Sequence, residues 1–214
     1  MVPYYSDESV TIYHGDCRDI LPSIGKVDLV LTDPPYGIGE AKGKNKSRGL
    51  LAQPKDYGVS AWDDAPIPWQ TLERLIAVGD KAIVFGGNFY PVPPSPCWLV
   101  WDKQINGDFA DCELAWTNLN GAVRRIVWMW NGMLQQDMKH KEYRWHPTQK
   151  PIPVMKWCIV QAEPCETVLD PFMGSGTTLV AAKSLNKKAI GIEIEERYCE
   201  IAANRCRQMV LALV

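Results

Sequence analysis

Short apolar runs alternate with stretches of helical spacing along most of the chain. We expect strands at Val10–Tyr13, Val27–Leu31, Lys81–Phe85, Cys97–Trp101, Thr167–Leu169 and Ala189–Ile192. We expect helices near Asp19–Leu21 and at Gln70–Val78, Pro151–Gln161, Leu179–Lys183 and about Glu195–Val210. Because strands and helices alternate, the pattern predicts an α/β fold with a parallel sheet.

The last predicted helix carries a clear apolar face. The residues whose spacing places them on that face, and which we expect to be buried, are Tyr198, Ile201, Ala202, Cys206 and Met209. Its arginines, Arg197, Arg205 and Arg207, are expected to form a solvated face.

Composition limits the classes of protein that fit. The chain has 214 residues, 46% of them hydrophobic and 22% charged, which suits one domain over residues 1–214. It has no apolar run of about 18 residues and no signal-peptide pattern, so we expect a cytoplasmic protein with no membrane contact. Seven cysteines without a Cys-x-x-Cys pair argue against a disulfide framework or a metal site. The net charge of −2 gives no global support for a polyanionic partner.

The four residues Asp33, Pro34, Pro35 and Tyr36 come after the largely apolar run Val27–Leu31, with only Thr32 between them. Proline fixes φ and disfavours helix for the residue before it, so the carboxylate and the ring are held on a rigid turn at a strand end. Ligands of open parallel sheets bind at this end of the strands. A carboxylate can accept hydrogen bonds from an exocyclic amine while an aromatic ring stacks on the base, which suits chemistry at a base amine.

A glycine-rich turn follows a second apolar strand. The segment Asp170–Thr178 includes Gly174 and Gly176, which let the backbone approach a ligand, although a tight turn without a ligand would look similar. Glu193 follows about 20 residues later at the end of another strand, where an acid can bind ribose hydroxyls. The turn lacks the lysine of a phosphate-binding loop, so the pair indicates a nucleoside cofactor.

Together the two motifs resemble those of amino-group DNA methyltransferases that use S-adenosylmethionine. His146–Pro151 and Ile12–Cys17 are similar to that family's segments beside the cofactor, and Ala82–Asn88, Trp98–Lys103 and Glu113–Thr117 are similar to its middle strands. The motif order resembles the β class. The resemblance implies a Rossmann-like S-adenosylmethionine-dependent methyltransferase fold, with a mostly parallel central sheet and helices on both faces.

The resemblance also implies the roles of individual residues. Asp33, Pro34, Pro35 and Tyr36 would be catalytic, with Asp33 also beside the cofactor. The methionine side of the cofactor would contact Asp170, Phe172, Gly174 and Gly176, its ribose Glu193, its adenine Asp16 and Cys17, and its carboxylate Thr148 and Lys150. Ser175 and Thr177 would also bind the cofactor. For Asp16, capping of the following helix is an equally good interpretation.

Two basic segments are candidates for contact with double-stranded DNA. Residues 37–61 are expected to form a mobile basic loop, and residues 121–145 a short target-recognition insertion. The residues expected to bind substrate are Lys42, Lys44, Lys46, Arg48, Arg124, Arg125, Lys139, Lys141 and Arg144. Each segment could instead be ordinary surface, and the tryptophans at 128 and 130 could instead pack inward as an edge strand.

The acid in the first motif is more typical of adenine-N6 enzymes in this family than of cytosine-N4 enzymes. We therefore expect methylation of adenine N6 in DNA after base flipping. Methylation of cytosine N4, of RNA or of a protein amide, and a noncatalytic nucleic-acid-binding module, are the alternatives. The short insertion favours a solitary or phage-type enzyme, and the sequence leaves a homodimer and a restriction-endonuclease partner open.

Overall fold

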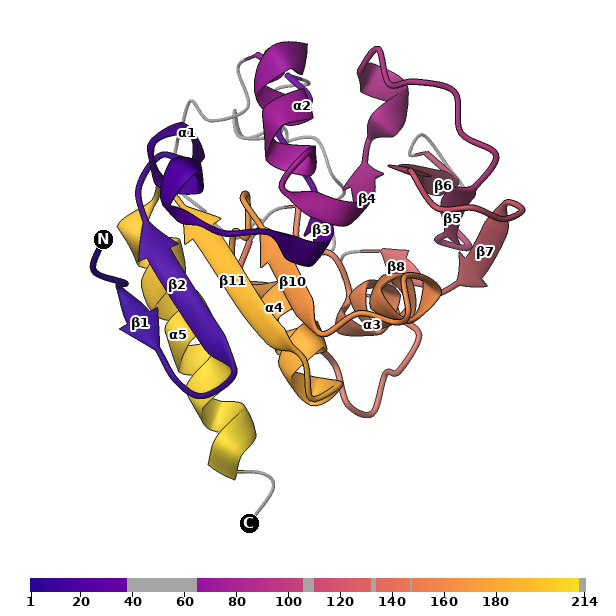
Figure 1. Cartoon of the computed structure of the whole chain (residues 1–214). Helices are drawn as coiled ribbons and strands as arrows, with labels where there is room; N and C mark the ends of the chain where they lie inside the picture. The colour runs from indigo at the N-terminus through magenta and orange to yellow at the C-terminus, as the bar shows by residue number, and fades with distance from the viewer. Residues whose placement is uncertain (38–64, 106–109, 132–133, 147, 212–214) are drawn as a thin grey trace.

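The computed structural model describes residues 1–37, 65–105, 110–131, 134–146 and 148–211 (Figure 1). The strands are β1 (Tyr5–Ser6), β2 (Val10–His14), β3 (Val27–Thr32), β4 (Gly79–Phe85), β5 (Trp98–Asp102), β6 (Cys112–Thr117), β7 (Arg124–Val127), β8 (Trp130–Asn131), β9 (Leu134–Gln135), β10 (Thr167–Asp170) and β11 (Lys188–Glu193). The α-helices are α1 (Cys17–Ile20), α2 (Trp69–Ile76), α3 (Ile152–Gln161), α4 (Thr177–Ser184) and α5 (Glu196–Leu211). Single 3-10 turns are η1 (Leu21–Ser23) and η4 (Gly87–Phe89).

Nine of the described strands form one sheet, in the order β1-β2-β11-β10-β3-β4-β6-β5-β7. Neighbours from β2 to β4 are parallel, and so are β5 and β7, which confirms the predicted mostly parallel sheet. The strand β6 is antiparallel to both β4 and β5, and β1 is antiparallel to β2. The remaining strands, β8 and β9, form a separate antiparallel pair.

Helices pack on both faces of the sheet. Successive side chains of a strand point to opposite faces, so an apolar strand contributes to both cores. Leu29 and Leu31 of β3 join the core beneath α3, α4 and α5, whereas Val30 joins the core beneath α1 and α2. Figure 1 shows these two helical layers with the sheet between them. In α5, Tyr198 and Cys206 are buried as predicted, and Ile201 is only half-buried. No helix in the described part of the chain is long and apolar enough to cross a membrane.

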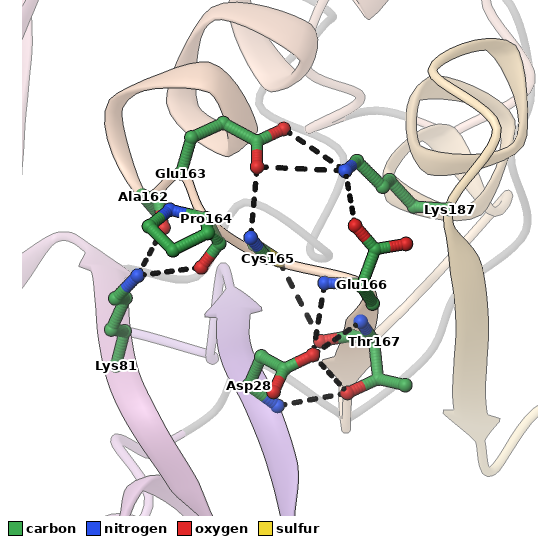
Figure 2. A network of polar contacts seen from close by, with 9 residues as sticks. All are labelled: Asp28, Lys81, Ala162, Glu163, Pro164, Cys165, Glu166, Thr167 and Lys187. Atoms are coloured by element: carbon green, nitrogen blue, oxygen red, sulfur yellow. Dashed lines mark hydrogen bonds and ion pairs between the residues drawn. The ribbon is translucent and has the colours of Figure 1, made fainter.

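Polar contacts brace the edge of the sheet where β3 and β10 begin (Figure 2). The Asp28 carboxylate accepts hydrogen bonds from the backbone N–H groups of Glu166 and Thr167 at 2.9 and 2.8 Å, and from the Thr167 hydroxyl at 2.8 Å. Nearby, Lys81 Nζ donates to two backbone carbonyls of the α3–β10 connection. This network holds together the amino ends of β3, β4 and β10. Asp33 and Asp170 lie at the opposite, carboxyl ends of β3 and β10.

Candidate active site

The carboxyl ends of β2, β3, β10 and β11 surround a cavity of about 380 Å³. Predicted cofactor residues that line it are Asp16, Cys17, Asp33, Thr148, Lys150, Asp170, Phe172, Gly174, Ser175, Thr177 and Glu193. The parallel strands bring these residues together because their carboxyl ends share one edge of the sheet. Of the predicted cofactor set, Gly176 does not line the cavity.

Asp33 lies directly after β3, where two side chains hold its carboxylate. The Tyr36 hydroxyl donates a hydrogen bond to Asp33 Oδ1, and the Lys150 ammonium forms an ion pair with Oδ2. Burial raises the pKa of Asp33, and the Lys150 charge opposes that shift. Lys150, which was expected to contact the cofactor carboxylate, lines the cavity and also pairs with Asp33.

The ion pair continues to two residues that sequence reasoning did not select. Glu113 of β6 lies 3.2 Å from Lys150 Nζ through Oε2 and 2.5 Å from Lys103 Nζ through Oε1. Burial alone would raise the pKa of Glu113, but the Lys150 and Lys103 ammonium groups hold this pKa below its usual value. A lone acid in a largely apolar strand was a sequence signal for this residue.

The Tyr36 ring packs on Gly86 and Phe89, in the segment after β4, and we call this contact surface the Tyr36 seat. Its ring stacks on Phe89 with centroids 4.9 Å apart and an interplanar angle of 16°. It also covers Gly86, which has φ +66°, and a Cβ at Gly86 would lie 2.1 Å from Tyr36 Cε1. The seat therefore requires glycine, and burial raises the pKa of the Tyr36 hydroxyl and keeps it a hydrogen-bond donor.

The glycine turn adopts backbone conformations that favour glycine. Gly174 and Gly176 have φ values of +49° and +79°, and Gly176 directly precedes α4. The backbone N–H of Gly174 donates to Glu193 Oε2 at 3.0 Å, so the turn and the acid of β11 are in contact. Burial raises the pKa of Glu193 to about 7 and that of Asp170 to about 6. Asp170 accepts hydrogen bonds from the hydroxyls of Thr32 and Thr178.

Asp16 and Cys17 lie where β2 passes into α1. Asp16 caps this helix by accepting the Arg18 N–H at 2.8 Å, and its carboxylate also binds the Arg18 guanidinium. The capping interpretation is thus confirmed, while Asp16 also lines the cavity. Cys17 is buried, and burial raises the pKa of its thiol to about 11.

Thr148 lies at the cavity beside His146. Its hydroxyl is 3.0 Å from His146 Nδ1, and the His146 ring packs edge-on against Tyr198 with centroids 4.5 Å apart. Burial lowers the pKa of His146 to about 3, so the imidazole is neutral near pH 7.

Arg205 of α5 contacts the glycine turn, so its predicted place on a solvated face was wrong. Its guanidinium donates to the Ser175 carbonyl at 2.7 Å and to the Thr177 hydroxyl at 3.2 Å. The Ser175 hydroxyl also donates to Gln149 Oε1 at 3.1 Å. The spacing of Arg205 from Tyr198 and Ala202, seven and three residues, places it beside their buried face.

The predicted substrate residues divide into two groups. Lys42, Lys44, Lys46 and Arg48, with nearly all of the predicted basic loop, lie outside the described residues. In the second segment, Arg124, Arg125, Lys139 and Lys141 are exposed and Arg144 is half-buried.

The tryptophans of the second segment pack inward, although Trp128 lies in the connection between β7 and β8 and not in an edge strand. Trp130 is buried in the core, and Trp128 is partly buried and packs against that core. The exposed aromatics are instead Tyr143 and Trp145, whose ring centroids lie 4.3 Å apart.

The sheet order, the glycine turn beside an acid and the Asp-Pro-Pro-Tyr turn at the same edge define an S-adenosylmethionine-dependent methyltransferase. A family model described as DNA methylase matches residues 98–204, and the chain belongs to this amino-group DNA methyltransferase family. It is 42% identical to YubD of Escherichia coli (strain K12) over 223 residues, covering 94% of this chain and 89% of YubD. It is 26% identical over 247 residues to DNA adenine methyltransferase YhdJ of the same strain, covering 94% and 84%.

Solved structures share the fold. M1.HpyAVI in its SAM complex superposes with a TM-score of 0.54 at 26% identity, covering 92% of this chain and 99% of that chain. The PvuII DNA methyltransferase, described as cytosine-N4-specific, gives a TM-score of 0.60 at 17% identity, covering 95% and 88%. The second likeness shows the fold alone.

The residues around the cavity fit S-adenosylmethionine. The cavity volume of about 380 Å³ lies in the range of small-molecule sites. Its lining combines carboxylates, which can accept hydrogen bonds from hydroxyl and amino groups, with the apolar side chains of Phe172, Ile192 and Ile194. The cofactor would supply an electrophilic methyl group at this edge of the sheet.

Proposed function

We propose that this DNA methyltransferase transfers the methyl group to the exocyclic N6 of adenine in double-stranded DNA. The observation that carries the proposal is the Asp33 carboxylate, held at the cofactor cavity by Tyr36 and Lys150. In this proposal Asp33 accepts the amino hydrogens of the substrate base.

The chemical problem is the amine lone pair, which is delocalised into the base ring. Asp33 and the Pro34 carbonyl accept the two amino hydrogens, so the nitrogen moves toward tetrahedral geometry and its lone pair becomes available. Bound S-adenosylmethionine would supply the electrophilic methyl group and keep the electron pair of the broken carbon–sulfur bond. The amino proton becomes acidic only as the nitrogen–carbon bond forms and would pass along its hydrogen bond to the Asp33 carboxylate, so a strong base is unnecessary.

The substrate must leave the duplex before Asp33 can reach it. Base flipping costs a few kcal/mol, and a pocket that holds the base by hydrogen bonds and stacking repays that cost. In this proposal Tyr36 stacks on the flipped base, and Phe89 supports Tyr36 from beneath through the parallel contact. Pro34 and Pro35 keep the turn rigid, so the amine is positioned for in-line attack.

Two observations favour adenine over cytosine. The motif begins with aspartate, which is more typical of adenine-N6 enzymes in the family, and YhdJ is named as a DNA adenine methyltransferase. The second candidate is cytosine N4, because cytosine also carries an exocyclic amine. Incubating labelled S-adenosylmethionine with duplex DNA of varied sequence, and identifying the modified nucleoside by mass spectrometry, separates the two.

Cofactor binding depends on Glu193 in this proposal. Glu193→Ala removes the carboxylate that accepts the ribose hydroxyls, so affinity for S-adenosylmethionine should fall by about 1–3 kcal/mol. Isothermal titration calorimetry measures the loss, with Glu200→Ala on the exposed face of α5 as the matched control. Parental affinity in Glu193→Ala would remove this residue from the ribose site.

DNA binding should depend on the charge of residues 37–61. Replacing Lys42, Lys44, Lys46 and Arg48 with alanine should weaken DNA affinity and leave cofactor affinity unchanged. Each lost phosphate contact should reduce the slope of log K against log salt by about 0.9. Fluorescence anisotropy over a salt series gives this slope. A slope equal to that of the parent would show that these four residues do not contact DNA phosphates.

A further inference from the structure

Glu113 is a charged side chain beside the reaction centre that the proposed chemistry at Asp33 leaves unused. It comes from β6, the antiparallel strand between β4 and β5, and not from the Asp-Pro-Pro-Tyr turn or the glycine turn. Asp33, Lys150, Glu113 and Lys103 follow one another in space with alternating charge, through three ion pairs. A row of alternating charges that ends on the catalytic carboxylate can change its pKa and its strength as a hydrogen-bond acceptor.

Three side chains of this row of charges are largely shielded from water. The Lys150 side chain is only 7% exposed, and the Asp33 and Glu113 side chains are 17% and 25% exposed. Lys150 also lies with Nζ 5.2 Å from the centroid of the Phe85 ring. Charges in such surroundings interact more strongly than in water, so moving or removing one of them changes the others.

Lysine has a flexible stem and a rotatable ammonium group, so one carboxylate alone does not fix its position. A second carboxylate within ion-pair distance of Nζ restricts it further, and the two carboxylates share its charge. Without Glu113, the full Lys150 charge would act on Asp33. It would polarise the carboxylate toward Lys150 and away from the substrate amino group. Asp33 would then be a weaker acceptor for an amino group.

We propose that Glu113 is a positioning residue for methyl transfer, which holds the Lys150 ammonium between two carboxylates so that Asp33 can accept hydrogens from the substrate amine. The inference rests on the proposed role of Asp33. Lys103 holds the far oxygen of Glu113 and completes the arrangement.

The proposal predicts opposite effects of two substitutions on Asp33. The charged or titratable groups around this carboxylate are Tyr36 on its own turn, Lys150, Glu113 of β6 and Asp170 of β10. Glu113→Gln removes a neighbouring negative charge, so the pKa of Asp33 falls and the acid limb of the kcat profile moves to lower pH. Lys103→Gln leaves Glu113 less neutralised, so the acid limb moves to higher pH.

Methyl transfer from tritiated S-adenosylmethionine to duplex DNA tests the effect on rate. We expect Glu113→Gln to lower kcat about tenfold, which corresponds to 1.36 kcal/mol, with both KM values nearly unchanged. Glu113→Asp should restore most of the rate because it keeps the charge. Glu73→Gln, on the exposed face of α2, is the matched control, and thermal melting checks that each variant is folded.

A second readout does not depend on activity. Carbon-13 NMR of labelled aspartate follows the titration of Asp33 without DNA, so it separates this inference from the choice of substrate base. An Asp33 titration that moves down in Glu113→Gln and up in Lys103→Gln supports the positioning role. Equal titration curves in the parent and both variants, or a folded Glu113→Gln with parental kcat, would overturn it.

Discussion

Replacing Asp33 with alanine should reduce methyl transfer at least 10²-fold while the fold remains largely intact. The substitution removes the acceptor that frees the amine lone pair, and loss of one preorganised transition-state hydrogen bond costs about 2.7–4 kcal/mol. The turn itself keeps Pro34 and Pro35, and Lys150 keeps its ion pair with Glu113. Initial rates with labelled cofactor and melting temperatures, measured on the same preparation, give both quantities.

The comparison needs a substitution that changes the same residue type away from the site. Asp80→Ala suits this purpose because Asp80 is exposed on β4 near the amino end of the sheet. If Asp33 only braced its turn, Asp33→Ala would lose stability and keep turnover. Near-parental turnover would therefore remove Asp33 from the chemistry.

Substituting Gly86 with alanine should lower both stability and turnover, although this residue touches neither cofactor nor substrate in our account. A left-handed conformation costs a non-glycine residue about 1–2 kcal/mol. The new methyl group would also lie 2.1 Å from Tyr36 Cε1, so the ring must leave its seat and its hydrogen bond to Asp33. Misplacing a catalytic group by about 1 Å can cost on the order of 10²-fold in rate.

Gly25→Ala provides the matched control for Gly86→Ala. Gly25 does not have a positive φ in the range that favours glycine, and no atom beyond its two chain neighbours lies within 4 Å of a Cβ built on it. Urea unfolding and initial-rate assays of the two variants should therefore differ sharply. A Gly86→Ala enzyme with the stability and turnover of Gly25→Ala would contradict the described Tyr36 seat.

The sequence predicted the elements that bring the two motifs together. Apolar strands ending at Thr32, Asp170 and Glu193 are parallel in the structure, and their carboxyl ends meet at one cavity. Such a prediction succeeds because strand ends and proline or glycine turns are encoded locally. Element ends were less accurate: α1 begins at Cys17, two residues before the expected short helix.

The residues that sequence reasoning missed act across strands and helices that are distant in the chain. Glu113 meets Lys150 only because β6 is inserted between β4 and β5, an order that periodicity does not encode. Gly86 is recognisable as special only once Tyr36 lies over it. Arg205 carried a weak signal in its spacing from Tyr198, but its charge favoured the solvated interpretation.

The pairing of Lys150 with Asp33 shows a different limit. The resemblance implied that Lys150 contacts the cofactor carboxylate, and it gave no sign of the two protein carboxylates that its ammonium contacts in the structure. Sequence patterns place a basic residue near a site but do not choose among the acids that surround it. Only the distances between side chains make that choice.

The identity of the methylated nucleoside tests the central claim most directly. Purified protein, labelled S-adenosylmethionine and duplex DNA of varied sequence would be incubated, and the digested nucleosides identified by mass spectrometry against the Asp33→Ala variant. Our account predicts N6-methyladenine from the parent protein and little or none from the variant. N4-methylcytosine as the product, or no labelled nucleoside in duplex DNA, would contradict it.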